Sequence, residues 1–349
     1  MNYWKSLLQA SITRAEALNH YLPTDNDAVR QVIARYPMRI NPYYLSLIRE
    51  KDDPLWKQAV PDIAEIEDDD GQDDPLHEEM QSPVANLIHR YPDRVVMLVS
   101  GQCAMFCRYC MRKRRVGQAA AITSETIHAG IDYIRNHSQI RDVILSGGDP
   151  LLLEDEQIGD ILAKIRAISH VEIIRIHSRI PCTLPQRITP QLCDILKRFH
   201  PLYLNTHFNH PDEITAESST ACAMLADAGI PLGCQTVLLR GVNDNAEVMK
   251  RLMQKLMMIR VKPYYIHQAD MIRGTRHFHT HPETGLEIIR KLRGYTSGMC
   301  VPQLMIDLPG GGGKIPLVPE YVIEKQADKW LIRNYENRIF EYGIGSLKK

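Results

Sequence analysis

Three cysteines stand close together in the sequence, at Cys103, Cys107 and Cys110. Thiolates are soft ligands that suit iron–sulfur clusters or zinc. A structural zinc site normally has four ligands, commonly in two Cys-x-x-Cys units, and this sequence has no second unit of that kind. Three thiolates can instead bind three irons of a [4Fe–4S] cube and leave the fourth iron open to another ligand. The triplet therefore predicts such a cluster, with a zinc site completed by a histidine as the alternative.

A glycine run ends in a single lysine in the segment LPGGGGKIP (308–316). It is not the phosphate-binding loop of nucleoside triphosphatases. That motif requires glycine at position 308 and serine or threonine at position 315, where this sequence has Leu308 and Ile315. A flexible segment without side chains can instead present one amine, that of Lys314. An amine whose pKa is lowered by desolvation can condense with an aldehyde cofactor. The segment therefore predicts a cofactor-bearing lysine.

A second glycine motif, SGGDP, spans residues 146–150. Two glycines allow the backbone to approach a ligand closely at low steric cost. Alone, this motif would be interpreted as an ordinary turn. Because it accompanies the cysteine triplet, we interpret it as a ligand-binding loop.

These motifs, together with HRYPDRV (89–95), PYYLSLI and DPLHEE, resemble those of the lysine 2,3-aminomutase family of radical S-adenosylmethionine (SAM) enzymes. The resemblance runs from about Tyr3 to Arg338. It implies a [4Fe–4S] cluster on the three cysteines, SAM at the open iron and pyridoxal 5′-phosphate (PLP) on Lys314. It also implies an electron donor, a radical generated from SAM, and migration of the amino group of lysine from the α-carbon to the β-carbon.

The resemblance assigns roles to further residues by their positions. Those near the cofactors are Arg90 and Arg94 for the PLP phosphate, Ser146, Gly147, Gly148 and Asp149 for the SAM methionine group, and His207 and Gln235 for the adenosyl group. Those for the substrate are Arg112 at the α-carboxylate, with Asp270 and Asp307 at the ε-ammonium. This set implies L-lysine as substrate and β-lysine as product.

Two features depart from the family pattern. Asn245 stands where longer members have a zinc-binding cysteine, and no cysteine follows Cys300. We therefore expect no stoichiometric zinc, which elemental analysis tests, and a reduced or different dimer contact. His267 stands where a tyrosine is expected, so we expect different contacts around the pyridoxal ring.

Other functions fit parts of the sequence. Short relatives supply β-lysine for the modification of elongation factor P, and mutases of glutamate or arginine are alternatives within the same reaction class. A nucleic-acid-modifying radical enzyme is the alternative from another class. Lys+Arg and Asp+Glu are both 42, so the net charge gives no electrostatic footprint for nucleic acid or an anionic membrane.

The sequence also bears on the compartment of the protein. No run approaches the ~20 apolar residues that span a bilayer, and the N-terminal residues lack the apolar segment of a signal peptide. We expect a cytoplasmic enzyme that acts on a small molecule and is able to form a homo-oligomer.

Short apolar, β-branched runs recur from residue 95 onward, each followed by a loop and a helical pattern. The runs span 95–100, 142–146, 171–177, 202–207, 231–239 and 261–267. Continuous apolarity is typical of parallel strands that are covered on both faces. About six such units predict an α/β fold, an incomplete or full barrel, with a doubly wound open sheet as the alternative. The family resemblance implies a partial (β/α)6 radical SAM barrel. Loops after such strands form the rim where barrels place their sites.

The predicted organisation has three parts. They are an N-terminal helical region (1–88), the barrel (89–300) and a C-terminal segment with the PLP lysine (301–349). The acidic stretch 65–79 is expected to be exposed, because it has too few apolar residues to pack. Three basic residues are expected to be solvated, Lys113, Arg114 and Arg115, and three histidines structural or exposed, His277, His279 and His281. The remaining cysteines are expected to be buried as small hydrophobic residues, namely Cys182, Cys193, Cys222, Cys234 and Cys300.

Overall fold

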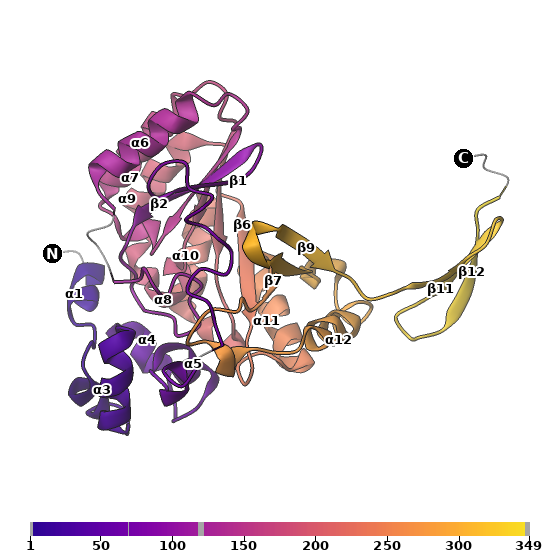
Figure 1. Ribbon diagram of the computed structural model, residues 1–349, viewed down its shortest axis with the longest axis horizontal. Coiled ribbons are helices and arrows are strands. Elements are labelled where there is room, and N and C mark those ends of the chain that lie inside the picture. Colours follow the sequence, from indigo (N-terminus) through magenta and orange to yellow (C-terminus); the bar gives the residue numbers. More distant parts are fainter. Residues whose placement is uncertain (1–2, 69, 118–121, 346–349) are drawn as a thin grey trace.

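The computed structural model describes residues 3–68, 70–117 and 122–345, and residues 1–2, 69, 118–121 and 346–349 lie outside the described part. A curved central sheet runs through the body of the molecule, and helices lie along it (Figure 1). Short N-terminal helices gather at one end of this body, and a small C-terminal sheet extends away from the other end (Figure 1).

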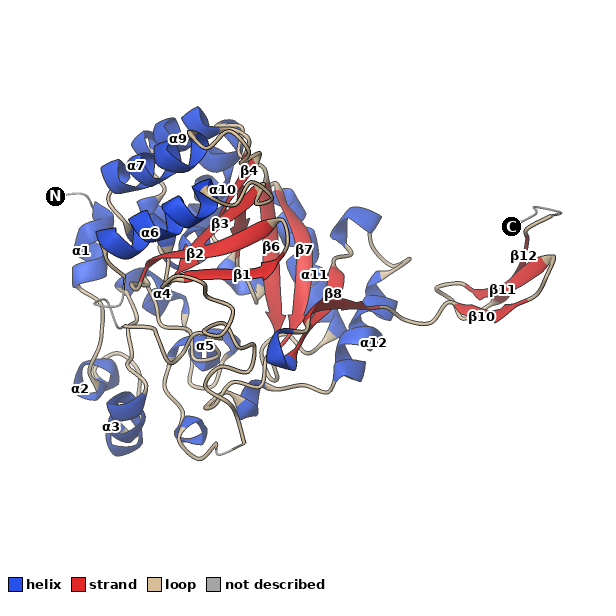
Figure 2. Ribbon diagram, turned by 45° about the horizontal axis from the view of Figure 1, so that its top comes forward, coloured by secondary structure: helices blue, strands red, loops and turns tan. Residues whose placement is uncertain are grey.

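The central sheet has nine strands within the described residues, and they lie side by side in sequence order. They are β1 (Leu87–Tyr91), β2 (Arg94–Ser100), β3 (Asp142–Gly147), β4 (Ile173–His177), β5 (Leu202–Thr206), β6 (Leu232–Leu238), β7 (Val261–Gln268), β8 (Gln303–Leu308) and β9 (Gly313–Leu317). Strands β2 to β8 pair in parallel, whereas β1 and β9 pair antiparallel at the two edges. The edge strands do not pair with each other, and the order never reverses. The fold is therefore a partial barrel, as predicted, and not a doubly wound sheet (Figure 2).

All six predicted apolar runs form strands, β2 to β7. Three further strands, β1, β8 and β9, carry polar residues, prolines or glycines and give no continuous apolar signal. The sheet therefore has one more parallel strand than predicted, and β1 spans the expected boundary at residues 88 and 89. In β6, buried and half-buried residues alternate along the strand. One face of this strand packs into the core, and the other contributes Gln235 and Val237 to the inside of the barrel.

Helices connect the parallel strands. They are α6 (Ser124–Arg135), α7 (Asp155–Arg166), α8 (Ile180–Thr183), α9 (Pro190–Leu196), α10 (Ala216–Asp227), α11 (Ala246–Met258) and α12 (Pro282–Leu292). Side chains of the preceding residues satisfy free backbone N–H groups at the helix starts. Asn245 accepts from the first turn of α11, and His281 does so for α12. The position expected for a lost zinc ligand is thus a helix cap.

The N-terminal helices are α1 (Tyr3–Gln9), α2 (Ala15–Asn19), α3 (Asn26–Arg35), α4 (Pro42–Leu47) and α5 (Pro54–Ala59). Their buried side chains Trp4, Tyr44 and Trp56 belong to the same apolar core as Leu162 and Leu196 of the barrel helices. Because one continuous core includes both regions, the N-terminal helices are packed on the barrel.

The expectation that the acidic segment 65–79 would be exposed was wrong in part. Glu65, Asp68 and Glu78 are buried, whereas Glu67, Asp70, Asp73 and Glu79 are exposed, and Asp69 lies outside the described part. Glu65 is fully buried, accepts from Arg108 Nε at 2.9 Å and accepts from Lys113 Nζ at 2.6 Å. Two cations offset the cost of burying this acid. Composition alone could not reveal them, because both come from the cysteine loop.

The basic run after the cysteines is likewise paired rather than solvated. Lys113 is buried, Arg114 lies 3.0 Å from Asp74, and Arg115 lies 3.3 Å from Glu79. The expectation that these residues would be solvated was wrong for Lys113 and Arg114, because acids of segment 65–79 neutralise them, whereas the Arg115–Glu79 pair lies at the surface, with 31% and 60% of the two side chains exposed.

Asp68, another buried acid, fastens the loop after β7. Its carboxylate accepts the backbone N–H groups of Gly274 at 2.8 Å, Thr275 at 3.0 Å and Arg276 at 3.1 Å. This loop carries Asp270, so the acidic segment helps to position a predicted substrate residue.

The predicted C-terminal segment (301–349) is divided between two sheets, because β8 and β9 belong to the central sheet, whereas β10 (Val322–Lys325), β11 (Lys329–Arg333) and β12 (Ile339–Gly343) form a separate antiparallel sheet. This separate sheet projects away from the barrel (Figure 1). The five cysteines outside the triplet are buried, as predicted. Across the described residues, no helix combines the length and apolarity required to traverse a bilayer.

Candidate functional site

A cavity of about 750 Å³ occupies the inside of the barrel. Its lining runs from Arg94 and Asp142, which begin β2 and β3, to the loops at the carboxyl ends of the strands. Every residue that the sequence predicted for the site lines this cavity, namely Arg90, Arg94, Cys103, Cys107, Cys110, Arg112, Ser146, Gly147, Gly148, Asp149, His207, Gln235, Asp270, Asp307 and Lys314. The fold thus brings residues that are up to 224 positions apart in the sequence, from Arg90 to Lys314, around one cavity.

The three cysteines follow β2 on the rim of this cavity. Burial raises the pKa of the Cys103 thiol well above its usual value, and the charges of Cys110 and Asp149 add to this. Burial likewise raises the pKa of Cys110 to about 11. Crowded, half-buried thiolates require positive partners, which metal ions supply. Within the described ranges, no three metal-binding side chains converge on one ion; in a cube each cysteine binds a different iron, so convergence is not required.

The SGGDP loop packs directly on the chain that carries the cysteines. A Cβ atom at Gly147 would lie 2.3 Å from the Ser100 carbonyl oxygen, and one at Gly148 would lie 2.4 Å from that of Gln102. Gly147 also has a φ of 127°, which side chains disfavour. Sequence reasoning missed this packing requirement, which holds the second loop against the first.

Asp149 connects the loops after β3 and β4. Its carboxylate accepts from Ser178 Oγ at 2.7 Å and from the Arg179 backbone N–H at 2.8 Å. Burial raises its pKa to about 6. The loop that faces the cysteines is therefore held to both of its neighbours.

The glycine run before Lys314 forms a tight turn between β8 and β9. Gly310, Gly311 and Gly313 have φ values of 68°, 82° and 87°. Only glycine adopts this left-handed backbone without steric cost. The run is therefore needed to reverse the chain.

That turn places Lys314 directly opposite Asp307 in the antiparallel β8–β9 pair. Lys314 Nζ donates to Asp307 Oδ2, and its backbone N–H donates to Tyr91 Oη at 2.9 Å. Asp307 is nearly buried, with 5% of its side chain exposed, whereas Lys314 is 34% exposed. Its amine therefore reaches the cavity from a fixed strand.

The two predicted phosphate-binding arginines occupy the same side of the barrel. Arg90 NH1 lies 3.6 Å from Asp307 Oδ1, and Arg90 Nε donates to Gln81 Oε1 at 2.7 Å. The Arg94 guanidinium lies 3.9 Å from the centre of the Tyr91 ring. Guanidinium groups suit phosphate because they present several donors in one plane.

Arg112 is held by an acid that sequence reasoning did not single out. Its NH2 and Nε donate to the two carboxylate oxygens of Glu78, at 2.7 and 3.1 Å. NH1 lies 3.4 Å from Ser146 Oγ. Glu78 occurs in the DPLHEE motif, which was used only as a point of resemblance. The pairing fixes one edge of the guanidinium and leaves other N–H groups toward the cavity.

Asp270 lies near a second acid within the cavity. Burial raises its pKa to about 7, and the negative charge of Asp307 acts in the same direction. Glu78 also raises this pKa, whereas the charges of Lys314 and Arg90 lower it. Two neighbouring carboxylates in one buried space favour a cationic ligand.

The remaining predicted residues line the cavity between the strands. His207 Nε2 lies 2.9 Å from Tyr109 Oη, and burial lowers its pKa well below the usual value. Gln235 lies on β6. His267 Nδ1 is 3.8 Å from Asp307 Oδ2, and burial keeps its pKa low. The expected departure at residue 267 thus lies beside Asp307.

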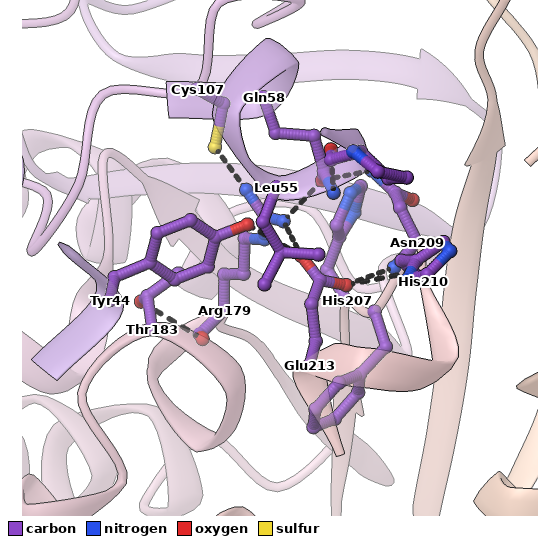
Figure 3. Close-up of polar contacts among 12 residues, drawn as sticks. Tyr44, Leu55, Gln58, Cys107, Arg179, Thr183, His207, Asn209, His210 and Glu213 are labelled. Atoms are coloured by element: carbon purple, nitrogen blue, oxygen red, sulfur yellow. Dashed lines mark hydrogen bonds and ion pairs between the residues drawn. The ribbon is translucent and has the colours of Figure 1, made fainter. Parts of the chain in front are cut away.

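Arg179 is a second site residue that the sequence did not reveal. Its NH1 group donates to Cys107 Sγ at 2.8 Å (Figure 3). Arg179 lies in the loop after β4, and no residue spacing in the sequence connects it with the cysteines.

Comparisons with known proteins agree with this geometry. Residues 97–253 match the family model described as the Radical SAM superfamily, so the barrel with its cysteine triplet is that of a radical SAM protein. Residues 289–344 match the model described as Lysine-2,3-aminomutase. The chain is 52% identical to the L-lysine 2,3-aminomutase of Clostridium subterminale over 98% of its own length and 84% of that protein. The chain belongs to the lysine 2,3-aminomutase family and is an isomerase.

A relative with another substrate is also similar. The chain is 44% identical to the glutamate 2,3-aminomutase of Clostridioides difficile over 97% of this chain and 82% of that protein. Among solved structures, coproporphyrinogen III oxidase from Escherichia coli has a TM-score of 0.40 and 12% identity, covering 72% of each chain. Because lysine and glutamate aminomutases are both similar to this chain, overall similarity does not identify the substrate, and the side chains that line the cavity must do so.

Proposed function

We propose that this chain interconverts L-lysine and β-lysine. The observation that carries the proposal is the pair of neighbouring acids, Asp270 and Asp307, in the same cavity as Lys314. Within the described residues, Asp307 Oδ1 is buried and accepts no hydrogen bond, and its nearest printed cation, Arg90 NH1, lies 3.6 Å away. A buried acid in this state is suited to a ligand that brings a donor and a positive charge. The ε-ammonium of lysine brings both, whereas glutamate brings a carboxylate.

The donor set of the cavity fits the cofactors of the family. Cys103, Cys107 and Cys110 would hold a [4Fe–4S] cluster with SAM, and Lys314 would hold PLP, with Arg90 and Arg94 at its phosphate. When bound, these groups supply the hydrogen-abstracting radical and the carrier of the migrating nitrogen. The protein supplies position and the exclusion of water. A cytoplasmic electron donor for the cluster is part of the proposal.

At the other end of the substrate, Arg112 would bind the α-carboxylate. Glu78 holds the guanidinium by its Nε and NH2. The remaining N–H groups are thereby oriented before substrate arrives, so less conformational entropy is lost on binding.

Asp307 would serve two ammonium groups in turn. Without PLP, it accepts the Lys314 ammonium. When Lys314 holds PLP, its amine would no longer donate to Asp307 as an ammonium, and Arg90, 3.6 Å from Asp307 Oδ1, would remain as a cationic partner of this acid. The carboxylate could then also accept a hydrogen bond from the ammonium of the substrate.

The proposal predicts a PLP adduct on one specific lysine. Borohydride reduction of the PLP-loaded protein, followed by peptide mass spectrometry, should yield a pyridoxyl group on Lys314. Lys314→Ala should abolish this adduct, whereas Lys325→Ala, at an exposed position in β10, should keep it. A reduced adduct on another lysine alone would contradict the assignment.

The pKa of Asp270 predicts how substrate use depends on pH. Its carboxyl group has a pKa of about 7 and binds an ammonium only when deprotonated, whereas a lysine ammonium stays charged up to about pH 10. The kcat/KM for lysine should therefore rise as pH increases through about 7. Asp270→Asn should have lower activity and should lose this limb of the profile. A limb that persists unchanged in Asp270→Asn would assign it to another group.

A further inference from the structure

Arg179 lies in the loop between β4 and α8, with only 10% of its side chain exposed. Its guanidinium contacts three groups at once (Figure 3). NH1 donates to Cys107 Sγ at 2.8 Å, and NH2 donates to Gln58 Oε1 and to Glu213 Oε1, both at 2.7 Å. A pairing with Glu213 alone would use one edge of the guanidinium. The other edge is directed at the cysteine sulfur.

The partners of Arg179 are themselves held in place. Glu213 is fully buried and accepts from Tyr44 Oη at 2.7 Å and from the backbone N–H groups of Asn209 at 2.6 Å and His210 at 2.9 Å. Figure 3 shows these contacts converging below the guanidinium. Since each hydrogen bond fixes the next, Arg179 cannot swing away from Cys107 without leaving a buried acid unpaired.

The backbone of Arg179 is held by a different residue from those that hold its side chain. Its N–H donates to the Asp149 carboxylate at 2.8 Å. Asp149 belongs to the SGGDP loop, which packs on the backbone just before the three cysteines. Both the main chain and the side chain of Arg179 are therefore positioned by loops around the cysteines.

A hydrogen bond from a cation to a cluster thiolate affects the oxidised and reduced cluster unequally. Reduction adds one negative charge, and a donor at the sulfur stabilises that charge, so the reduction potential rises. The negative charge of Glu213 cancels most of the long-range electrostatic effect of the Arg179 guanidinium on the cluster. The direct hydrogen bond from NH1 to Cys107 Sγ remains, so Arg179 acts mainly on this one cluster ligand.

We propose that Arg179 is a positioning residue that orients the Cys107 thiolate and makes the cluster easier to reduce. This inference rests on the proposed cluster site at the three cysteines. It extends that proposal from the ligands to the residue that adjusts their redox behaviour. Reduction must precede SAM cleavage, so Arg179 acts at the first electron-transfer step.

The test is a redox titration of the anaerobic, cluster-loaded protein without SAM, followed by electron paramagnetic resonance. Arg179→Lys keeps the charge for Glu213 but lacks the planar fork that reaches Cys107 at the same time. It should retain about four irons per chain and be harder to reduce by about tenfold, which is ~59 mV for one electron. Arg179→Gln should shift the potential in the same direction. Arg290→Gln, which removes a half-buried surface arginine of α12 that pairs with Glu283, should leave the potential unchanged.

The outcomes separate this inference from the proposed cluster site. A fully loaded Arg179→Lys with the parent potential would overturn the role of Arg179 and leave the cluster site intact. Weakened SAM binding at an unchanged potential would also overturn it and would assign the arginine to the SAM carboxylate; Arg179 Nε has no hydrogen-bond partner within the described residues. Parent protein that binds no iron would overturn the cluster site, and this inference with it.

Discussion

Replacing any one of Cys103, Cys107 or Cys110 by alanine should remove the cluster and abolish turnover. A [4Fe–4S] cube with one open iron already uses only three protein ligands, so none is redundant. Iron analysis and anaerobic turnover of lysine measure the two losses.

A matched control separates cluster loss from general damage to the fold. Cys222→Ala removes a buried cysteine of α10 that lies outside the cavity lining, and it should keep both iron and activity. Full activity in any variant of the triplet would refute the radical mechanism. Loss of iron in Cys222→Ala as well would mean that the triplet variants report on stability.

Asp270→Ala and Asp307→Ala should each lower kcat/KM for lysine severely. Breaking a buried ion pair costs about 3–5 kcal/mol, which corresponds to about two to four powers of ten. Asp307 also holds Lys314, so Asp307→Ala should additionally alter PLP loading, whereas Asp270→Ala should retain PLP. Anaerobic turnover with product identification, together with the PLP absorbance, distinguishes the two effects.

Comparing lysine, glutamate and arginine as substrates tests the roles of Asp270 and Asp307 further. Glutamate would place its carboxylate against two acids and should be rejected by the parent enzyme, while arginine keeps the positive end but is longer and planar. Asp328→Ala, at an exposed position of the C-terminal sheet, should behave like the parent. Preference for glutamate, or unchanged lysine turnover in both cavity variants, would overturn the assignment of lysine.

The sequence by itself determined the main chemistry and most of the scaffold. The cysteine spacing, the lysine after the glycine run and the six apolar runs are local patterns, and local patterns report directly on strand burial and ligand spacing. The family could be predicted for the same reason. The strands β1, β8 and β9 were missed because their polar and glycine residues interrupt the apolar signal.

The tertiary structure decided which charges meet. Glu65 and Glu78 are buried because cations from the cysteine loop reach them, and the acidic composition of their segment indicates only exposure. The glycine run proved to be a turn that sets Lys314 against Asp307. Arg179 meets Gln58 and Glu213 across 121 and 34 residues of sequence. Such pairs form because the curved sheet brings distant loops to one rim. Residues that are far apart in the sequence produce no local pattern from which their pairing could be predicted.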